Sequence, residues 1–409
     1  MSTPTPALAS TDAVAHTSIP AGTSAVPAAS RGDAFASFDV EAFEVPTSKD
    51  EAWRFTPLRR LRGLHDGSAP ATGTLTVDVV APEGITVETV GRDDPRLGAA
   101  GTPVDRVAAQ AWTSFTDATV ISVGQSSEIS EPVMITMTGP GVGLTAYGHT
   151  QVRLAAFASA VVVLDQRGSG TVAENVELVI GDGARLTIVT VQDWAADAVH
   201  VAAHHALVGR DGVLRHTAVS IGGDLVRLSP TVRYAGPGGD AELLGVYFAD
   251  AGQHLEQRLF VDHSEPHCRS NVMYKGALQG LSDEGKVDRD VPDAHTVWIG
   301  DVLIRAAAEG TETYEMNRNL VLTDGARADS VPNLEIETGE IVSAGHASAT
   351  GRFDDEQLFY LRARGITEEQ ARRLVVRGFF HEVLAKIAVV EVRERLEHAI
   401  EAELAAVGV

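Results

Sequence analysis

The 409-residue chain contains a single cysteine, Cys268, and aromatic residues make up only 5% of it. One cysteine excludes an intramolecular disulfide framework and any metal site built from several cysteines of the same chain. No run of eighteen or more apolar residues occurs, so we expect no membrane-spanning helix.

Basic residues are also scarce, since 33 Lys and Arg stand against 56 Asp and Glu for a formal net charge of −23. Nucleic-acid binding needs a clustered basic face, so this balance argues against it. The phosphate-binding glycine loop, the G-x-S-x-G elbow and the H-E-x-x-H zinc helix are all missing. These absences predict a protein of the reducing cytoplasm that binds no nucleic acid and no membrane.

The first thirty residues contain four prolines, one acid and no base, and they are rich in Ala, Ser and Thr. A secretory signal needs a positive start and an apolar core, and this segment has neither. Such a composition cannot bury enough surface to offset the entropy lost on ordering. The sequence therefore predicts a disordered tail over residues 1–33.

A helical or mixed region is predicted over residues 34–118. Ser48 with Glu51 three residues later fits a capping box, which satisfies free backbone amides at the start of a helix. Trp53 is expected to anchor this short helix. Alternating apolar and polar residues between 74 and 136 predict strands, interrupted by one helical pattern.

Residues 119–350 carry the most informative pattern. Short β-branched runs are separated by turns centred on glycine, and the turn phrase recurs at Gly183, Gly212 and Gly239, 29 and 27 residues apart. Gly325 repeats it later in the chain. A period in the high twenties without intervening helices is typical of a β-solenoid, whereas a β-sandwich rarely repeats its turns. We therefore predict a mainly β fold with a parallel β-helix core.

Helical periodicity fills residues 351–409. Thr367 with Gln370 predicts a capping box at the start of one long helix. The apolar stripe predicted for that helix contains Leu374, Val375, Phe379, Val383 and Leu384. A second helix is expected from about 389 to 406, and its apolar face contains Val392, Leu396, Ile400 and Leu404.

His346 is the leading candidate for chemistry. It lies in "SAGHASATG", where small neighbours would let another chain approach closely. Imidazole nitrogen is a competent iron ligand. On the residues alone, the favoured interpretation is a buried interface histidine that is hydrogen-bonded to backbone, and an iron ligand is the alternative.

Other histidines are weaker candidates. His263, His267 and Cys268 have the residue types of an iron or zinc site, but neighbouring strand positions face opposite ways, so three ligands on one segment are not expected. The adjacent His204 and His205 must likewise point to opposite faces of a strand.

Three segments are distinctive when taken together: "SKDEAWRFTPLRRL" at 48–61, "NRNLVLTDGARADSVPNLEIET" at 317–338 and "GHASATGRFDDEQLFYLRARGIT" at 345–367. Together they resemble the SufB/SufD family of iron–sulfur cluster assembly proteins. The resemblance covers essentially the whole chain beyond the tail. It implies a helical N-terminal region, a right-handed parallel β-helix core and a C-terminal helical domain.

The resemblance is closer to SufD than to SufB. SufB-like chains carry a cysteine two residues before this histidine, where the present chain has Ala344. The family implies a SufBCD-type complex, with a SufB-like partner bound through the β-helix core. It also implies a SufC-like ATPase docked on the C-terminal helices, for which the stripe of Leu374, Phe379, Val383 and Leu384 is the expected surface. The chain itself is then a non-catalytic scaffold subunit without a bound nucleotide.

In that setting the cargo is iron or a nascent iron–sulfur cluster, held transiently and shared with the partner chain. His346 would be its ligand from this chain, and Cys268 would be a weaker candidate as a sulfur relay. Two other functions stay open: a purely structural scaffold without a ligand of its own, and a β-solenoid enzyme acting on carbohydrate. The second fits poorly because such enzymes are commonly exported and this chain shows no signal sequence.

Overall fold

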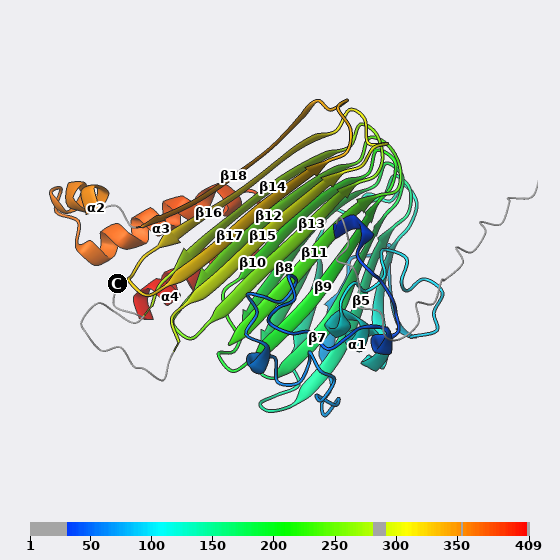
Figure 1. Cartoon of the computed structure of the whole chain (residues 1–409), viewed down its shortest axis with the longest axis horizontal. Helices are drawn as coiled ribbons and strands as arrows, with labels where there is room; N and C mark the ends of the chain where they lie inside the picture. The colour runs from blue at the N-terminus through cyan, green and yellow to red at the C-terminus, as the bar shows by residue number, and fades with distance from the viewer. Residues whose placement is uncertain (1–30, 281–291, 353–354, 407–409) are drawn as a thin grey trace, which may run out of the picture.

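The computed structural model describes residues 31–280, 292–352 and 355–406. Its strands form a β-solenoid of two facing sheets (Figure 1). The chain alternates between the sheets, so successive strands of one sheet are separated in sequence by a strand of the other. The predicted mainly β solenoid core is therefore confirmed. The predicted disordered tail lies outside the described residues, except for the 3-10 turn η1 (Arg31–Asp33).

Each sheet has nine strands within the described ranges. From the N-terminal to the C-terminal end of the solenoid, sheet A contains β1 (Thr76–Val80), β4 (Val133–Thr138), β6 (Ser159–Gly168), β8 (Arg185–Trp194), β10 (Val213–Ser220), β12 (Asp240–Ala249), β14 (Arg269–Leu278), β16 (Glu312–Val321) and β18 (Ser343–Arg352). In the same direction, sheet B contains β2 (Ile85–Gly91), β3 (Asp117–Val123), β5 (Thr145–Leu154), β7 (Thr171–Ile180), β9 (Val199–Val208), β11 (Leu225–Tyr234), β13 (His254–His263), β15 (His295–Ile304) and β17 (Arg327–Ile336). All pairings are parallel except β1 with β4 and β2 with β3, which are antiparallel.

The glycine turns mark one corner of successive turns of the solenoid. Gly183, Gly212 and Gly239 precede β8, β10 and β12, whose first residues are paired in register. Gly183 has a φ of +66°, a left-handed conformation that glycine adopts without steric penalty. Gly325 precedes β17 of sheet B instead, so this copy of the phrase lies at the other corner.

Side chains that alternate along the strands fill the space between the sheets with one continuous apolar core. Trp298, Tyr247 and Tyr274 are its largest fully buried members. One turn of the solenoid cannot bury its inward-facing side chains by itself. The turns are therefore stable only when they stack and share the core.

The N-terminal region covers the outer face of sheet B and contains η2 (Val40–Ala42), η3 (Leu58–Leu61) and α1 (Arg106–Ser114). Its buried apolar side chains pack on outward-facing residues such as Val199 and Leu225. Since most of the region is irregular, only part of the predicted helical content is present.

The helix predicted from a Ser48–Glu51 capping box is absent, and that prediction was wrong. The segment forms turns instead, in which the Thr47 backbone amide donates a 2.6 Å hydrogen bond to Asp50 Oδ2. Local side-chain bonds of this kind compete with the helical bonds of the backbone. Trp53 is nevertheless buried, as expected of an anchor.

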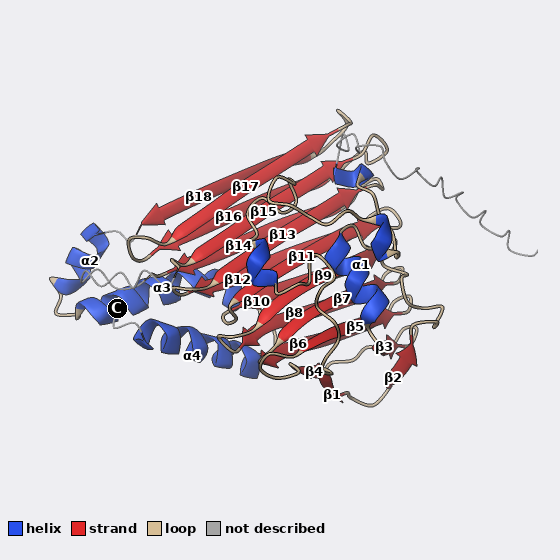
Figure 2. Ribbon diagram, turned by 60° about the horizontal axis from the view of Figure 1, so that its bottom comes forward, coloured by secondary structure: helices blue, strands red, loops and turns tan. Residues whose placement is uncertain are grey.

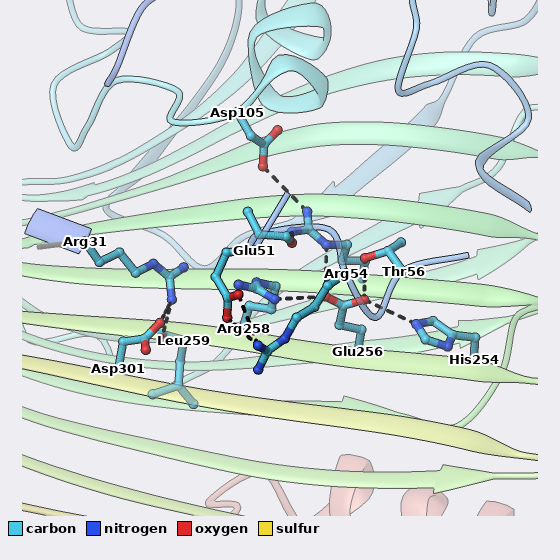
Figure 3. Close-up of polar contacts among 12 residues, drawn as sticks. Arg31, Glu51, Arg54, Thr56, Asp105, His254, Glu256, Arg258, Leu259 and Asp301 are labelled. Atoms are coloured by element: carbon cyan, nitrogen blue, oxygen red, sulfur yellow. Dashed lines mark hydrogen bonds and ion pairs between the residues drawn. The ribbon is translucent and has the colours of Figure 1, made fainter. Parts of the chain in front are cut away.

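A buried charge cluster fixes this turn segment to sheet B (Figure 3). Glu256, on the outer face of β13, accepts a 2.6 Å hydrogen bond from Thr56 Oγ1 and a 3.2 Å hydrogen bond from Arg227 Nε. Nε2 of His254 and Nη1 of Arg258 lie 3.2 and 3.6 Å from the same carboxylate. Burial raises the pKa of Glu256, but Arg227 first, then the hydrogen bond to His254 and the charge of Arg258, lower it well below its usual range.

Arg227 connects the cluster to two other parts of the N-terminal region. Its guanidinium lies 3.8 Å from the centre of the Trp53 ring, and its Nη1 lies 3.5 Å from Asp105 Oδ2. Asp105 also caps α1 by accepting a hydrogen bond from the Ala108 amide. One arginine of sheet B thus holds both the turn segment and the start of α1.

The C-terminal helices are α2 (Asp355–Arg362), α3 (Glu368–Leu384) and α4 (Val390–Ala406). The predicted capping box is confirmed, because Thr367 and Gln370 each accept the other's backbone amide. Helices α3 and α4 pack against the outer face of sheet A, where Arg395 forms a two-pronged ion pair with Asp165. Within the described ranges, no helix is both long enough and apolar enough to cross a membrane.

Several histidines are buried in the solenoid without a charged partner. Burial lowers the pKa of His205 and His216 to about 4 and that of His263 to about 3. Unfolding restores the ordinary value near 6.5. Below that pH the unfolded chain therefore binds protons that the folded chain rejects, and stability falls as the pH falls.

We expect the substitution His216→Gln to flatten this acid dependence. Between pH 6 and 4.5 the slope of the unfolding free energy against pH should decrease by about 1.4 kcal/mol per pH unit, the value for one proton. Denaturant titrations at several pH values measure that slope. His398→Gln, at an exposed position of α4, is the control and should leave the slope unchanged; equal slopes for both variants would contradict the prediction.

Candidate functional site

The C-terminal end of the solenoid is open within the described part of the chain. Figure 2 shows β17 and β18 at one end of the stacked strands and β1 and β2 at the other. All residues of β17 and β18 are at least partly exposed, whereas the inner strand β13 is buried throughout. Each end strand has backbone groups free on one side, and such edges are templates for pairing with another chain.

His346 lies near the middle of edge strand β18 and faces the solenoid interior. Ala344, two residues earlier and therefore on the same face, packs against the interior core. The His346 side chain remains 43% exposed because no further strand of the described residues covers it. The predicted ligand is thus placed at the rim of the solenoid, within reach of a docked chain.

Among the described residues, His346 lies within ion-pair distance of Glu315, which the sequence did not single out. The two residues are paired in register on β16 and β18, and His346 Nδ1 lies 3.7 Å from Glu315 Oε1. The Glu315 side chain is only 1% exposed. Burial, with a smaller contribution from Asp301, raises its pKa to about 8 against an opposing effect of the Asn333 amide.

Cys268 has the surroundings of a small buried hydrophobic residue. It is fully buried in the interior core, and its Sγ lies 3.6 Å from the carbonyl oxygens of Gly236 and Pro266. Burial raises the pKa of the thiol to about 11. Because the thiolate is the reactive form, this environment gives Cys268 little reactivity as a sulfur relay.

The remaining histidine candidates do not converge. His263 is buried and lies 2.9 Å from the Ser270 hydroxyl, whereas His267 is exposed in the following turn. His204 faces His216 inside the solenoid, and His205 lies on the outer face next to Gly101. Among the residues that the structure describes, no three His, Cys, Asp or Glu side chains are grouped to hold a metal ion.

The stripe predicted as an ATPase-docking surface is divided between core and surface. Val383 and Leu384 are buried against sheet A, and Phe379 is partly buried there. Leu374 is 51% exposed. Three of the four stripe residues are therefore at least partly covered, and only Leu374 is exposed to a partner.

These features define a solenoid scaffold with one open, polar end and two outer faces covered by the chain's own segments. Comparison with known sequences gives the family: the description "SUF system FeS cluster assembly, SufBD core domain" matches residues 135–379. The chain belongs to the SufBD family of iron–sulfur cluster assembly proteins. Membership decides against the carbohydrate-active enzyme that the sequence left open.

Three relatives illustrate the family. An iron–sulfur cluster assembly SufBD family protein of Mycobacterium tuberculosis is 67% identical over 91% of this chain and 93% of its own length. The corresponding protein of Mycobacterium leprae is 64% identical over 93% of this chain and 96% of its own length. A second SufBD family protein of Mycobacterium tuberculosis is 27% identical over 56% of this chain and 25% of its own length.

Proposed function

We propose that this chain is the SufD-like, non-catalytic subunit of a SufBCD-type scaffold that assembles iron–sulfur clusters in the cytoplasm. The observation that carries the proposal is the placement of His346 on the open edge strand, beside Ala344 on the same face. A SufB-like chain would have a thiolate at the position of Ala344. The cluster must then draw its sulfur ligands from elsewhere, since Cys268 is buried and protonated.

The open end is the proposed contact with a SufB-like partner. Strands β17 and β18 offer free backbone groups on one side, so a partner solenoid can continue the stack by strand pairing. The presence of two SufBD family proteins in Mycobacterium tuberculosis supports a partner of the same family. Iron or the nascent cluster is the cargo held between the two chains.

We expect His346→Ala to lower cluster formation by the complex by at least about tenfold, because changes around a metal site typically cost 10–100-fold in affinity or activity. The measure is iron and acid-labile sulfide per complex after anaerobic reconstitution with the partner and ATPase. The heterodimer should persist, since one rim side chain carries little of an interface's energy. His267→Ala, another exposed histidine, is the control.

Two results would speak against the ligand assignment. Full cluster content in the His346→Ala complex would favour the purely structural scaffold. Loss of the heterodimer, with any remaining complex fully active, would make His346 a packing residue. A stable, stoichiometric cluster on the isolated chain would contradict the shared site itself.

The proposed docking surface for the SufC-like ATPase lies on α2 and the start of α3. Phe359, Tyr360 and Leu374 are 75%, 57% and 51% exposed there, and Figure 1 shows α2 standing clear of both sheets. Large apolar side chains exposed together mark interaction sites more often than chance. In this proposed docking surface, Phe359 and Tyr360 take the place of Val383 and Leu384, which were predicted to bind the ATPase but are buried.

The double substitution Phe359→Ala with Leu374→Ala should weaken ATPase binding by at least about tenfold, since a buried interface anchor is commonly worth 2 kcal/mol or more. Co-purification and titration of the ATPase against the full complex measure the loss. Val390→Ala removes a comparably exposed apolar side chain at the start of α4 and should have no effect. Undiminished ATPase binding in the double variant would move the docking site elsewhere.

A further inference from the structure

Glu315 is an unusual residue for the interior of a solenoid. Its carboxylate is almost fully buried, yet apart from a weak interaction with the Asn333 amide neither oxygen has a hydrogen bond of normal geometry to another described residue. Burying a carboxyl group that is so weakly hydrogen-bonded opposes folding, since most buried polar side chains are hydrogen-bonded. Packing alone would be better served by glutamine or an apolar residue.

The surroundings nevertheless make room for this carboxylate. Gly300, on β15 across the interior, lies directly opposite, and a Cβ atom there would clash with Glu315 Oε2 and with the Trp298 ring. The interior is therefore shaped around an acidic side chain at this position. On its other side the carboxylate faces His346 of the edge strand, in register and one turn of the solenoid later.

The separation of the two side chains is informative. At 3.7 Å, His346 Nδ1 and Glu315 Oε1 are too far apart for a hydrogen bond. Two donor atoms that each lie about 2.0–2.2 Å from one metal ion are roughly 3–4 Å apart, which includes this distance. Imidazole with carboxylate is also the donor set that non-haem ferrous sites use.

We propose that Glu315 and His346 form a two-ligand half-site for ferrous iron at the open end of the solenoid, completed by ligands from the docked partner chain. The inference rests on the proposed function, which assigns His346 alone, and adds a second ligand from the preceding turn. A half-site of two protein ligands holds iron weakly by itself, so loading depends on docking of the partner. On binding the ion, the Glu315 carboxyl gives up its proton and supplies a negatively charged oxygen ligand in place of neutral water.

The test uses the full complex with the SufB-like partner, titrated anaerobically with ferrous iron in competition with a chelator. Glu315→Gln keeps the shape of the side chain and removes the charge. We expect it to weaken iron binding by at least about tenfold, as for His346→Ala, with the double variant little worse than either. Glu312→Gln is the matched control, since Glu312 lies on the same strand but points outward to Arg269.

Thermal unfolding of the same variants separates a ligand from a structural residue. Because the buried carboxyl has no good partner, Glu315→Gln should leave the midpoint unchanged or raise it. A midpoint lowered by several degrees with iron affinity intact would overturn the inference and make Glu315 structural. If His346→Ala weakens iron binding and Glu315→Gln does not, the inference falls while the proposed function stands; if neither does, both fall.

Discussion

Replacing Glu256 by alanine is expected to lower the free energy of unfolding by about 3–5 kcal/mol, the loss typical when one member of a buried ion pair is removed. Glu256 is fully buried and faces Arg227, Arg258 and His254, while Thr56 donates to it. Without the carboxylate, two guanidinium groups stay buried next to each other. The repulsion between Arg227 and Arg258 should destabilise sheet B and also the packing of the turn segment against it.

The substitution should also loosen the N-terminal region before the solenoid core unfolds. Thr56 and Trp53 reach the sheet through this cluster, so their segment should become more sensitive to proteolysis and hydrogen exchange. Glu312→Ala is the control, because its ion pair with Arg269 is exposed and such pairs contribute about 0–1 kcal/mol. If both variants lost a similar amount of unfolding free energy, the buried cluster would contribute no more to stability than an exposed ion pair does.

The repeating core could be predicted because its signal is local and recurs. Turns at Gly183, Gly212 and Gly239 each close one turn of the solenoid at the same corner, and register follows from their spacing. The N-terminal segment could not be predicted in the same way. Its conformation depends on Arg227 and Glu256, which are far away in the sequence and create the pocket that Trp53 and Thr56 occupy.

The candidate site was only half visible in the sequence for a related reason. His346 stands among small residues, which is a local signal. Glu315 can be recognised as a candidate only from the structure. The pairing of β16 with β18 places it next to His346, and the alternation of side chains along β16 points it into the solenoid interior. The strand starts at Arg269, Glu312 and Ser343 are 43 and then 31 residues apart, so no fixed period could have paired these two residues.

In helix α3, a shift of one residue in the predicted buried face changes which side chains are expected to be free for a partner. Phe379 and Phe380 are adjacent, and periodicity allows either to face the core. The predicted stripe contained Leu374 and Phe379, but Val376 and Phe380 are buried in their place, while Val383 and Leu384 are buried as predicted. The face of α4 was predicted correctly, since all four residues expected on it are buried.

Phe380→Ala should therefore lower the free energy of unfolding by about 3–5 kcal/mol, the usual range for removing a buried phenylalanine. Phe380 is fully buried among the outward-facing apolar side chains of sheet A, and alanine would leave a cavity under α3. Chemical denaturation of the full chain measures the change. Leu374→Ala, on the exposed side of the same helix, should change stability by no more than about 0.5 kcal/mol.

The two variants also separate stability from partner binding. Deleting residues 366–409 would uncover the apolar outer face of sheet A that α3 and α4 now protect, so a truncated chain should aggregate and reports nothing about docking. Phe380→Ala, measured where it is still folded, should retain ATPase binding, whereas Leu374→Ala with Phe359→Ala should lose it. Equal destabilisation by Phe380→Ala and Leu374→Ala would mean that α3 presents its other face to the sheet, and the docking surface proposed on α2 and α3 would have to be withdrawn.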